Sequence, residues 1–305
     1  MRLGGVLTAL VTPYDDAGSL DLDALERHVT RLESAGVHGF FACGTTGEGA
    51  LLDAEEKQQV ISTVCEHAGG DAQVIAAVIQ ADTRSAVAEA KAHASLGVKF
   101  IAVVAPYYIR VDQAELVAHF TAVADASRVP VVAYDIPGNT ANPLNDEIYD
   151  RILTHENIIA VKDSSGDFSR FSRRVIEQKQ SGEDGIDWIQ GEDTLDGVAL
   201  LAGASGVVSG LSNILPGAFV DMVEAARGGN VKRVFALQHV INTVHRIIRG
   251  TGKGVAPIRL ALSQMGYGSR YLRTKSMSLG AEWDEPVHSA VESAQALYRS
   301  VSADA

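Results

Sequence analysis

The sequence has few of the residues that mark disulfide-bonded, metal-binding, nucleic-acid-binding or membrane proteins. Only two cysteines, Cys43 and Cys65, occur among 305 residues, which excludes a disulfide framework and a four-cysteine zinc site and favours a reducing cytoplasm. The nine histidines show no metal-ligand spacing, and a net charge of −12 excludes the basic surface that nucleic acids require. No apolar run approaches the roughly 18 residues of a membrane span. We therefore expect an acidic cytoplasmic protein without nucleic-acid, membrane or metal partners.

Eight short apolar stretches dominate the first two thirds of the chain. They lie at residues 6–10, 39–42, 74–78, 100–104, 131–134, 158–161, 186–189 and 206–209, and amphipathic helical patterns separate them. Gly36, Gly97 and Gly206 each stand where a helix would close in the left-handed conformation and a strand would follow. This alternation predicts an α/β fold, a (β/α)8 TIM barrel, and no G-x-G-x-x-G follows any strand to favour a doubly wound sheet.

Helical patterns alone occupy the rest of the chain, at residues 216–227, 231–248, 255–265 and 286–301. No low-complexity linker precedes them. We therefore predict a barrel over residues 1–227 and a C-terminal helical extension over residues 228–305, packed on the barrel. Within the barrel, Asn142-Pro143 predicts the start of a helix with proline at its first position. The glycine-rich run Gly250–Gly254 lacks the spacing of a phosphate loop and follows a helix, so no phosphate site is expected there.

A lysine ends the most uniformly apolar of these stretches, Ile158–Val161. Such a stretch is typical of a parallel strand buried on both faces, where an ammonium group is costly unless it is paired or loses its proton. Without the proton, the Lys162 amine is a nucleophile that can attack a ketone and form a Schiff base. The alternative is a strand-end lysine that reaches solvent or pairs with Asp163.

The residues after the other strands supply matching chemistry, because active sites of TIM barrels lie where the strands end. The run Cys43–Gly49 brings two hydroxyls, Thr45 and Thr46, and glycines whose backbone N–H groups can hold a carboxylate, although a plain glycine-rich turn has the same composition. Tyr108 and Tyr134 follow or end two further strands, where a tyrosine also serves for packing. An amine, phenols and an anion-binding loop together indicate an enzyme that condenses carbonyl compounds.

Five motifs make the chain resemble the dihydrodipicolinate synthase / N-acetylneuraminate lyase family of class I aldolases, in the order and spacing of that family. They are Gly44-Thr45-Thr46-Gly47-Glu48, Pro106-Tyr107-Tyr108, Tyr134-Asp135-Ile136-Pro137, Val161-Lys162-Asp163-Ser164-Ser165-Gly166 and Gly203-Ala204-Ser205-Gly206-Val207-Val208. The resemblance implies a TIM-barrel lyase in which Lys162 forms a Schiff base with pyruvate or another 2-keto acid. It implies no cofactor.

The resemblance also implies roles for the other candidate residues. Tyr134 would transfer protons, Thr45 and Thr46 would hold the keto-acid carboxylate, and Thr46 would relay protons between Tyr134 and Tyr108. The carbonyl of Val208 would line the pocket. In this family the second of the paired tyrosines commonly reaches across a dimer interface, so the implied assembly is a homotetramer, a dimer of dimers. The partners are a keto acid and an aldehyde.

The chain departs from the family's lysine-pathway synthases at Asn139. Those synthases carry an arginine there, which binds the carboxylate of the aldehyde, and an amide cannot replace that charged fork. With Asn139 as a substrate-binding residue, we expect cleavage of a 2-keto-3-deoxy sugar acid or a similar hydroxylated 2-keto acid. The alternatives are 4-hydroxy-tetrahydrodipicolinate synthase with another residue in the arginine's place, a Schiff-base dehydratase, and a non-catalytic keto-acid sensor.

Overall fold

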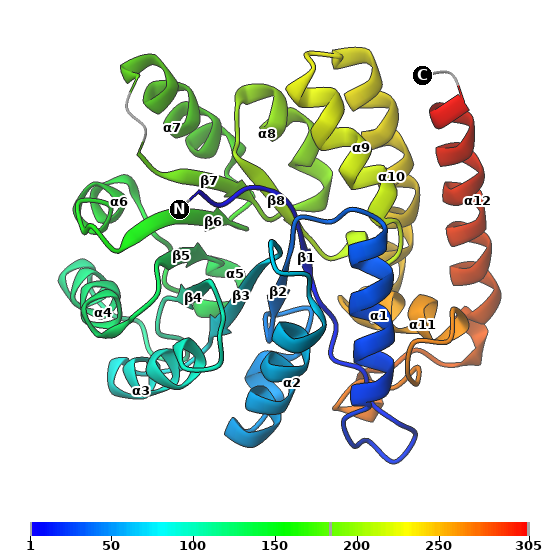
Figure 1. Cartoon of the computed structure of the whole chain (residues 1–305), viewed down its shortest axis with the longest axis horizontal. Helices are drawn as coiled ribbons and strands as arrows, with labels where there is room; N and C mark the ends of the chain where they lie inside the picture. The colour runs from blue at the N-terminus through cyan, green and yellow to red at the C-terminus, as the bar shows by residue number, and fades with distance from the viewer. Residues whose placement is uncertain (1, 183–184, 304–305) are drawn as a thin grey trace.

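Eight parallel strands form a closed barrel in the computed structural model, which describes residues 2–182 and 185–303 (Figure 1). The strands are β1 (Gly5–Ala9), β2 (Gly39–Ala42), β3 (Gln73–Val78), β4 (Phe100–Val104), β5 (Val131–Asp135), β6 (Ile158–Asp163), β7 (Asp187–Gln190) and β8 (Gly206–Ser209). Each strand pairs with its neighbours in sequence, and β8 returns to β1 with Gly206 opposite Gly5. The predicted TIM barrel is therefore confirmed: β2, β4 and β8 have the predicted ends, and the other strands differ from the predicted ends by one or two residues.

Helices surround the strands in the alternating order that the sequence predicts. They are α1 (Leu22–Ser34), α2 (Ala54–His67), α3 (Thr83–Ala94), α4 (Gln113–Ala126), α5 (Pro137–Thr140), α6 (Asp146–Ile152), α7 (Phe168–Ser181), α8 (Asp196–Ala202) and α9 (Pro216–Arg227). Single 3-10 turns lie at Gly49–Leu51, Asp193–Leu195, Leu211–Asn213, Lys275–Met277 and Ala281–Trp283. No helix in the described ranges has the length and apolar character that crossing a bilayer requires.

Short polar residues fix where several of these helices begin. At α2, Asp53 accepts a hydrogen bond from the backbone N–H of Glu56, and the Glu56 side chain accepts one from the backbone N–H of Asp53. Gly36 and Gly97 adopt positive φ after α1 and α3, as predicted. The prediction for Gly206 was wrong, because Gly203 takes the left-handed position after α8 and Gly206 lies within β8.

The helix predicted to start at Asn142-Pro143 also begins later. Asn145 caps α6 by accepting a hydrogen bond from the backbone N–H of Ile148. The Asn142 side chain instead donates to the carbonyls of Pro106 and Ile109, which ties this loop to the one after β4. Tertiary hydrogen bonds therefore override the local proline signal.

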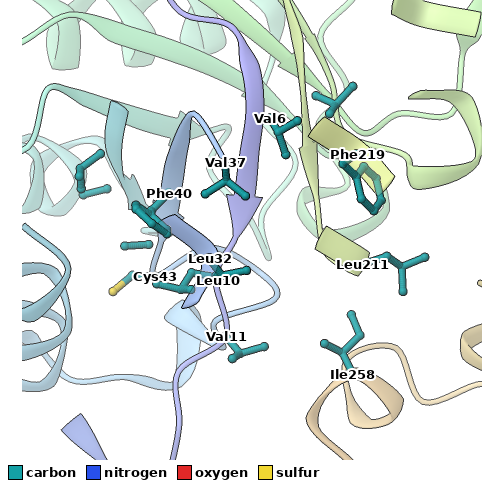
Figure 2. Close-up of a cluster of buried hydrophobic side chains, with 14 of the residues drawn as sticks. Val6, Leu10, Val11, Leu32, Val37, Phe40, Cys43, Leu211, Phe219 and Ile258 are labelled. Carbon is teal, nitrogen blue, oxygen red and sulfur yellow. The ribbon is translucent and has the colours of Figure 1, made fainter. Parts of the chain in front are cut away.

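Side chains that alternate along the strands build two apolar layers. Leu7, Phe41 and Ile75 belong to the cluster that fills the barrel interior. Their strand neighbours Val6 and Phe40 face the helices, and Figure 2 shows them in the same cluster as Phe219 of α9 and Leu211. Because successive side chains of a strand point to opposite faces, the face on which a strand residue lies follows from its position alone. Tyr134 belongs to the interior cluster.

Three further helices follow α9: α10 (Val231–Thr251), α11 (Ala256–Gln264) and α12 (Asp284–Ala303). Helix α10 packs against α9 and α12, and α11 packs against α10 and α12 (Figure 1). These helices lie where the sequence predicts the C-terminal extension. The division of the chain at residues 227 and 228 stays a prediction about domain organisation.

Candidate active site

Lys162 lies inside the mouth of the barrel. It is the fifth residue of β6, which continues to Asp163, and only 4% of its surface is exposed. Its Nζ atom lies 3.8 Å from the centre of the Tyr134 ring and 4.1 Å from that of Phe41. Aromatic faces attract an ammonium group and keep water away from it. The amine is therefore held in a fixed, largely dry position.

Tyr134 stands directly opposite Lys162, because the two residues are register partners on β5 and β6. Its side chain is buried, and its hydroxyl lies 3.5 Å from Oγ1 of Thr45. Burial by itself raises the pKa of the phenol, but the charge of Lys162 and hydrogen bonds to the phenol outweigh burial and lower the pKa from its ordinary value of 10. The phenol is thus prepared to give and take a proton.

The loop after β2 presents Thr45 and Thr46 to the same space. Cys43 and Glu48 both adopt positive φ, which bends the backbone sharply. A Cβ atom on Gly49 would lie 1.7 Å from the carbonyl oxygen of Cys43, so only glycine fits at that position. The sharp bend is what places the two threonines at the barrel mouth.

A cavity of about 300 Å³ opens at the carboxyl ends of the strands. Its walls contain six of the seven predicted site residues: Thr45, Thr46, Tyr134, Asn139, Lys162 and Val208. It is also lined by Ala9, Ile136, Gly138, Ser164, Gly191, Glu192, Asp193, Gly210, His245, Gly254, Val255 and Ile258. The structure therefore brings together residues from six of the eight strand ends.

Tyr108 is the predicted site residue that does not reach this cavity. It follows β4, adopts a positive φ of 74°, and is 91% exposed. Its neighbour Tyr107 lines an outer cavity of about 550 Å³ that shares Thr45, Ile136, Asn139, Gly254 and Val255 with the inner one. Within a single chain the Tyr108 side chain thus lies outside the cavity that Lys162 lines.

The C-terminal helices complete the site, which the sequence did not reveal. His245 of α10 and Ile258 of α11 line the inner cavity, and Lys253, between these helices, lines the outer one. The glycine-rich run at residues 250–254, which contains Lys253, is the signal that marks this segment in the sequence. Helix α10 extends to Thr251 and occupies the first two positions of this run.

Part of the wall of the inner cavity is acidic. Glu192 and Asp193 follow β7, and His245 Nε2 lies 3.7 Å from a carboxylate oxygen of Glu192. Burial raises the pKa of Asp193 to about 6, against hydrogen bonds from Ser209 and from backbone N–H groups. In the part of the chain that the structure describes, Lys162 is the one lysine or arginine in the wall of the inner cavity. Among the described residues, no three histidine, cysteine or acidic side chains are grouped to hold a metal ion.

Comparison with known proteins places the chain in a family. Residues 2–294 match the model of the dihydrodipicolinate synthetase family. The chain is 34% identical over 282 residues to 4-hydroxy-tetrahydrodipicolinate synthase 2 of Streptomyces coelicolor, covering 92% of each chain. It is 33% identical over 276 residues to the 4-hydroxy-tetrahydrodipicolinate synthase of Methanoculleus marisnigri, covering 86% of this chain and 94% of the relative.

Solved structures agree with these matches. The 4-hydroxy-tetrahydrodipicolinate synthase of Methylacidiphilum fumariolicum superposes with a TM-score of 0.91 at 25% identity, covering 99% of both chains. The chloride-inhibited dihydrodipicolinate synthase of Acinetobacter baumannii, in complex with pyruvate, gives a TM-score of 0.90 at 28% identity, covering 96% of this chain and 99% of that one. The chain therefore belongs to the dihydrodipicolinate synthetase family of class I, pyruvate-dependent aldolases, which are carbon–carbon lyases that act through a Schiff base.

Proposed function

We propose that Lys162 is the lysine that forms the Schiff base with pyruvate. Its amine makes a C–N bond to the keto carbon, and the keto oxygen leaves as water. The imine then loses a methyl proton, and the resulting enamine forms a C–C bond to the aldehyde carbon. Hydrolysis returns the free lysine, and cleavage follows the same steps in reverse. The observation that carries this proposal is the buried Lys162 amine, 3.8 Å from the Tyr134 ring at the barrel mouth.

The neighbouring residues have the chemistry that these steps need. Tyr134 moves the protons, since its phenol has a lowered pKa and faces the amine across the β5–β6 register. Thr45 and Thr46 bind the pyruvate carboxylate at the loop after β2, and Val208 lines the same cavity. The pyruvate complex of the relative from Acinetobacter baumannii supports pyruvate as the keto acid.

The wall of the inner cavity favours an uncharged, hydroxylated aldehyde partner. Asn139 offers a neutral amide where the family's lysine-pathway synthases carry an arginine. The carboxyl groups of Glu192 and Asp193 accept hydrogen bonds from hydroxyls and repel a carboxylate. The reaction that fits this wall is cleavage, or formation, of a 2-keto-3-deoxy sugar acid or a similar hydroxylated 2-keto acid.

The second candidate is 4-hydroxy-tetrahydrodipicolinate synthase, and the names of the relatives favour it. Its aldehyde, aspartate semialdehyde, carries a carboxylate and needs a cation in the arginine's place. Lys253 is suited to that role, because it lines the outer cavity, which Asn139 also lines. Its Nζ atom donates to the carbonyl of Ser278 at 3.0 Å and keeps further N–H donors.

We further propose a homotetramer, a dimer of dimers, in which Tyr108 of one chain reaches the site of its neighbour. Tyr108, Ile109 and Leu51 are 91%, 63% and 48% exposed, which is unusual for large apolar side chains beside a cavity. The reducing cytoplasm stays the expected compartment, and both cysteines are free.

Borohydride trapping tests the Schiff base. After incubation with pyruvate and reduction, peptide mass spectrometry should find the adduct on the Lys162 peptide of the wild type and find none in Lys162→Ala. Without an adduct in the wild type, the proposed chemistry fails and a non-catalytic keto-acid sensor takes its place. Turnover with hydroxylated aldehydes and with aspartate semialdehyde, measured side by side, then chooses between the two candidates. An adduct that eliminates water without C–C cleavage identifies a dehydratase.

A further inference from the structure

A cluster of buried charges lies directly behind the Tyr134–Lys162 pair. The next residues on the two strands, Asp135 and Asp163, are also register partners. Because strand side chains alternate, Tyr134 and Lys162 lie inside the barrel whereas the two aspartates lie on its outer face. Their contacts there come from α6 and α7, which contribute Tyr149 and Arg170.

Two carboxyl groups share one guanidinium in this cluster. Arg170 Nη2 lies 2.8 Å from Oδ2 of Asp135 and 3.5 Å from Oδ2 of Asp163. Asp135 and Asp163 are 1% and 2% exposed, and the Arg170 side chain is 14% exposed. Two carboxylates that contact the same guanidinium nitrogen repel each other strongly in a dry environment. The cluster therefore depends on the charge of Arg170 between them.

The cluster also holds the backbone on both sides of the catalytic pair. Asp135 accepts hydrogen bonds from the backbone N–H of Leu144 at 3.2 Å and from the Tyr149 hydroxyl at 3.1 Å. Asp163 accepts bonds from the backbone N–H of Ser165 at 2.8 Å and from its hydroxyl at 2.6 Å. Each aspartate thus joins its strand to the loop or helix outside the barrel.

The backbone of the same residues continues toward the cavity. The carbonyl of Asp135 accepts a hydrogen bond from the N–H of Ser164, and that of Asp163 accepts one from the N–H of Gly191. Ser164 and Gly191 both line the inner cavity. A Cβ on Gly191 would lie 3.0 Å from Cε of Lys162, so a small shift of this backbone changes the space around the amine.

We propose that Asp135, Asp163 and Arg170 are positioning residues, which fix the separation of the ends of β5 and β6 and thereby hold the Tyr134 phenol opposite the Lys162 amine. None of the three lines the cavity, so they act through the two strands and not on the substrate. The inference rests on the proposed Schiff base at Lys162 and adds the residues that support it.

The titratable groups in and around the cluster come from four elements: Asp135 on β5, Asp163 on β6, Tyr149 on α6 and Arg170 on α7. Asp167 lies just before α7. Burial and the charge of Asp163 raise the pKa of Asp135, and Arg170 opposes both, so that the pKa lies at about 6. Near pH 6 the cluster therefore changes charge directly behind the catalytic pair.

The test measures how fast the pyruvate adduct forms, with cyanoborohydride present to trap it, as a function of pyruvate concentration. A displacement of about 1 Å costs up to about 100-fold in rate, so we expect Arg170→Met to slow the saturating rate by about 10- to 100-fold. The half-saturating pyruvate concentration should change by less than about threefold, because the residues that contact pyruvate are unchanged. Arg170→Lys keeps the charge but loses the two-pronged guanidinium. Its saturating rate should lie between those of Arg170→Met and the wild type.

The matched control is Arg174→Met on the same helix. The Arg174 side chain is 17% exposed, and it pairs with Asp146 and Asp150 on the outer surface instead of with the strands. This control should form the adduct within about twofold of the wild-type rate, since surface ion pairs contribute little.

A companion variant covers loss of folding. The triple variant Asp135→Asn/Asp163→Asn/Arg170→Met leaves no unpaired charge, so it should fold. It also lacks the ion pairs that fix the two strand ends, so adduct formation should stay slow. If this variant and a folded Arg170→Met both form the adduct at the wild-type rate, the cluster serves stability alone and the inference is overturned. If the wild type forms no adduct, the proposed function fails and this inference fails with it.

Discussion

Glu48 and Arg259 join the threonine loop to helix α11: Arg259 Nη2 lies 3.4 Å from Oε1 of Glu48, and Arg259 is fully buried. The same carboxylate accepts a hydrogen bond from the backbone N–H of Arg273 at 2.9 Å. Burial raises the pKa of Glu48, and the two arginines oppose that rise. The C-terminal part of the chain therefore holds the loop that carries Thr45 and Thr46.

Arg259→Met should destabilise the fold strongly, because the buried Glu48 carboxylate loses the guanidinium of Arg259. We expect the free energy of unfolding to fall by about 3–5 kcal/mol. Urea unfolding followed by circular dichroism measures the change. Arg227→Met is the control, since the Arg227 side chain is 52% exposed and pairs with Glu224 on the surface. A loss at Arg259 no larger than at Arg227 would show that Glu48 is stabilised by other groups.

Tyr134→Phe should leave Lys162 able to form an adduct with pyruvate but slow turnover by about 100- to 10,000-fold, the range for loss of a general acid–base group. The measurements are the steady-state rate of pyruvate release or consumption and the mass of the trapped adduct. Tyr107→Phe is the control, because Tyr107 lines only the outer cavity and should keep most activity. Near-normal turnover in Tyr134→Phe would assign proton transfer to a different group.

Asn139→Arg should change the choice of aldehyde. The new guanidinium would present a bidentate fork at the rim shared by both cavities, so the ratio of kcat/KM for aspartate semialdehyde to that for a hydroxylated aldehyde should rise at least about 10-fold. Asn139→Gln, which adds length without charge, is the matched control. An unchanged ratio would mean that position 139 does not contact the aldehyde.

Lys253→Met tests the second candidate function directly. If Lys253 binds the carboxylate of aspartate semialdehyde, the variant should raise KM for that substrate by about 10-fold or more, since a charge-assisted hydrogen bond is lost. The rate of trapping with pyruvate alone should not change. Initial rates over a range of aldehyde concentrations separate these effects, and equal KM values in variant and wild type would remove Lys253 from aldehyde binding.

Asp196 should make the protein less stable as the pH rises. It is fully buried, and neither carboxyl oxygen has a hydrogen-bond partner in the described part of the chain. Burial raises its pKa well above 3.8, and Asp193 and Glu192 raise it further. Above pH 3.8 the unfolded chain releases this proton while the folded chain keeps it, so the free energy of unfolding falls by about 1.4 kcal/mol per pH unit until the folded-state pKa is reached.

Urea titrations between about pH 4.5 and pH 8 measure this slope. Asp196→Asn should flatten it, because the amide does not titrate. Asp71→Asn, at an exposed position in a turn, should leave the slope as in the wild type. Equal slopes in Asp196→Asn and wild type would place the pH dependence in other carboxyl groups.

The sequence was sufficient to predict the barrel because strands and helices leave different periodic patterns. It was also sufficient for the residues at the strand ends, such as Lys162 and Tyr134, since the topology of a closed parallel barrel brings those ends together. Asn142 shows the limit: its hydrogen bonds to the carbonyls of Pro106 and Ile109 involve residues more than 30 positions away, and no local pattern contains them.

The contributions of α10 and α11 to the cavity were not predictable for the same reason. His245 belongs to α10 and Lys253 to the turn between α10 and α11, and nothing in helical periodicity says which end of the barrel these helices cover. The cluster of Asp135, Asp163 and Arg170 was predictable only in part. The register of β5 and β6 follows from the fold, but the arginine that the two aspartates share comes from a helix whose rotation only the structure gives.

The pairing of β8 with β1 has a consequence for how this protein is made. Because β1 finds its second partner in residues 206–209, the sheet stays open on the ribosome until those residues have emerged. The wall supplied by α10 and α11 is synthesised later still, and at about 5–20 residues per second the stretch from residue 210 to residue 264 takes roughly 3 to 11 s. During that interval the nascent chain already carries Lys162 but lacks the helices that complete the inner cavity. The Lys162 amine is therefore synthesised before the part of the wall that α10 and α11 supply.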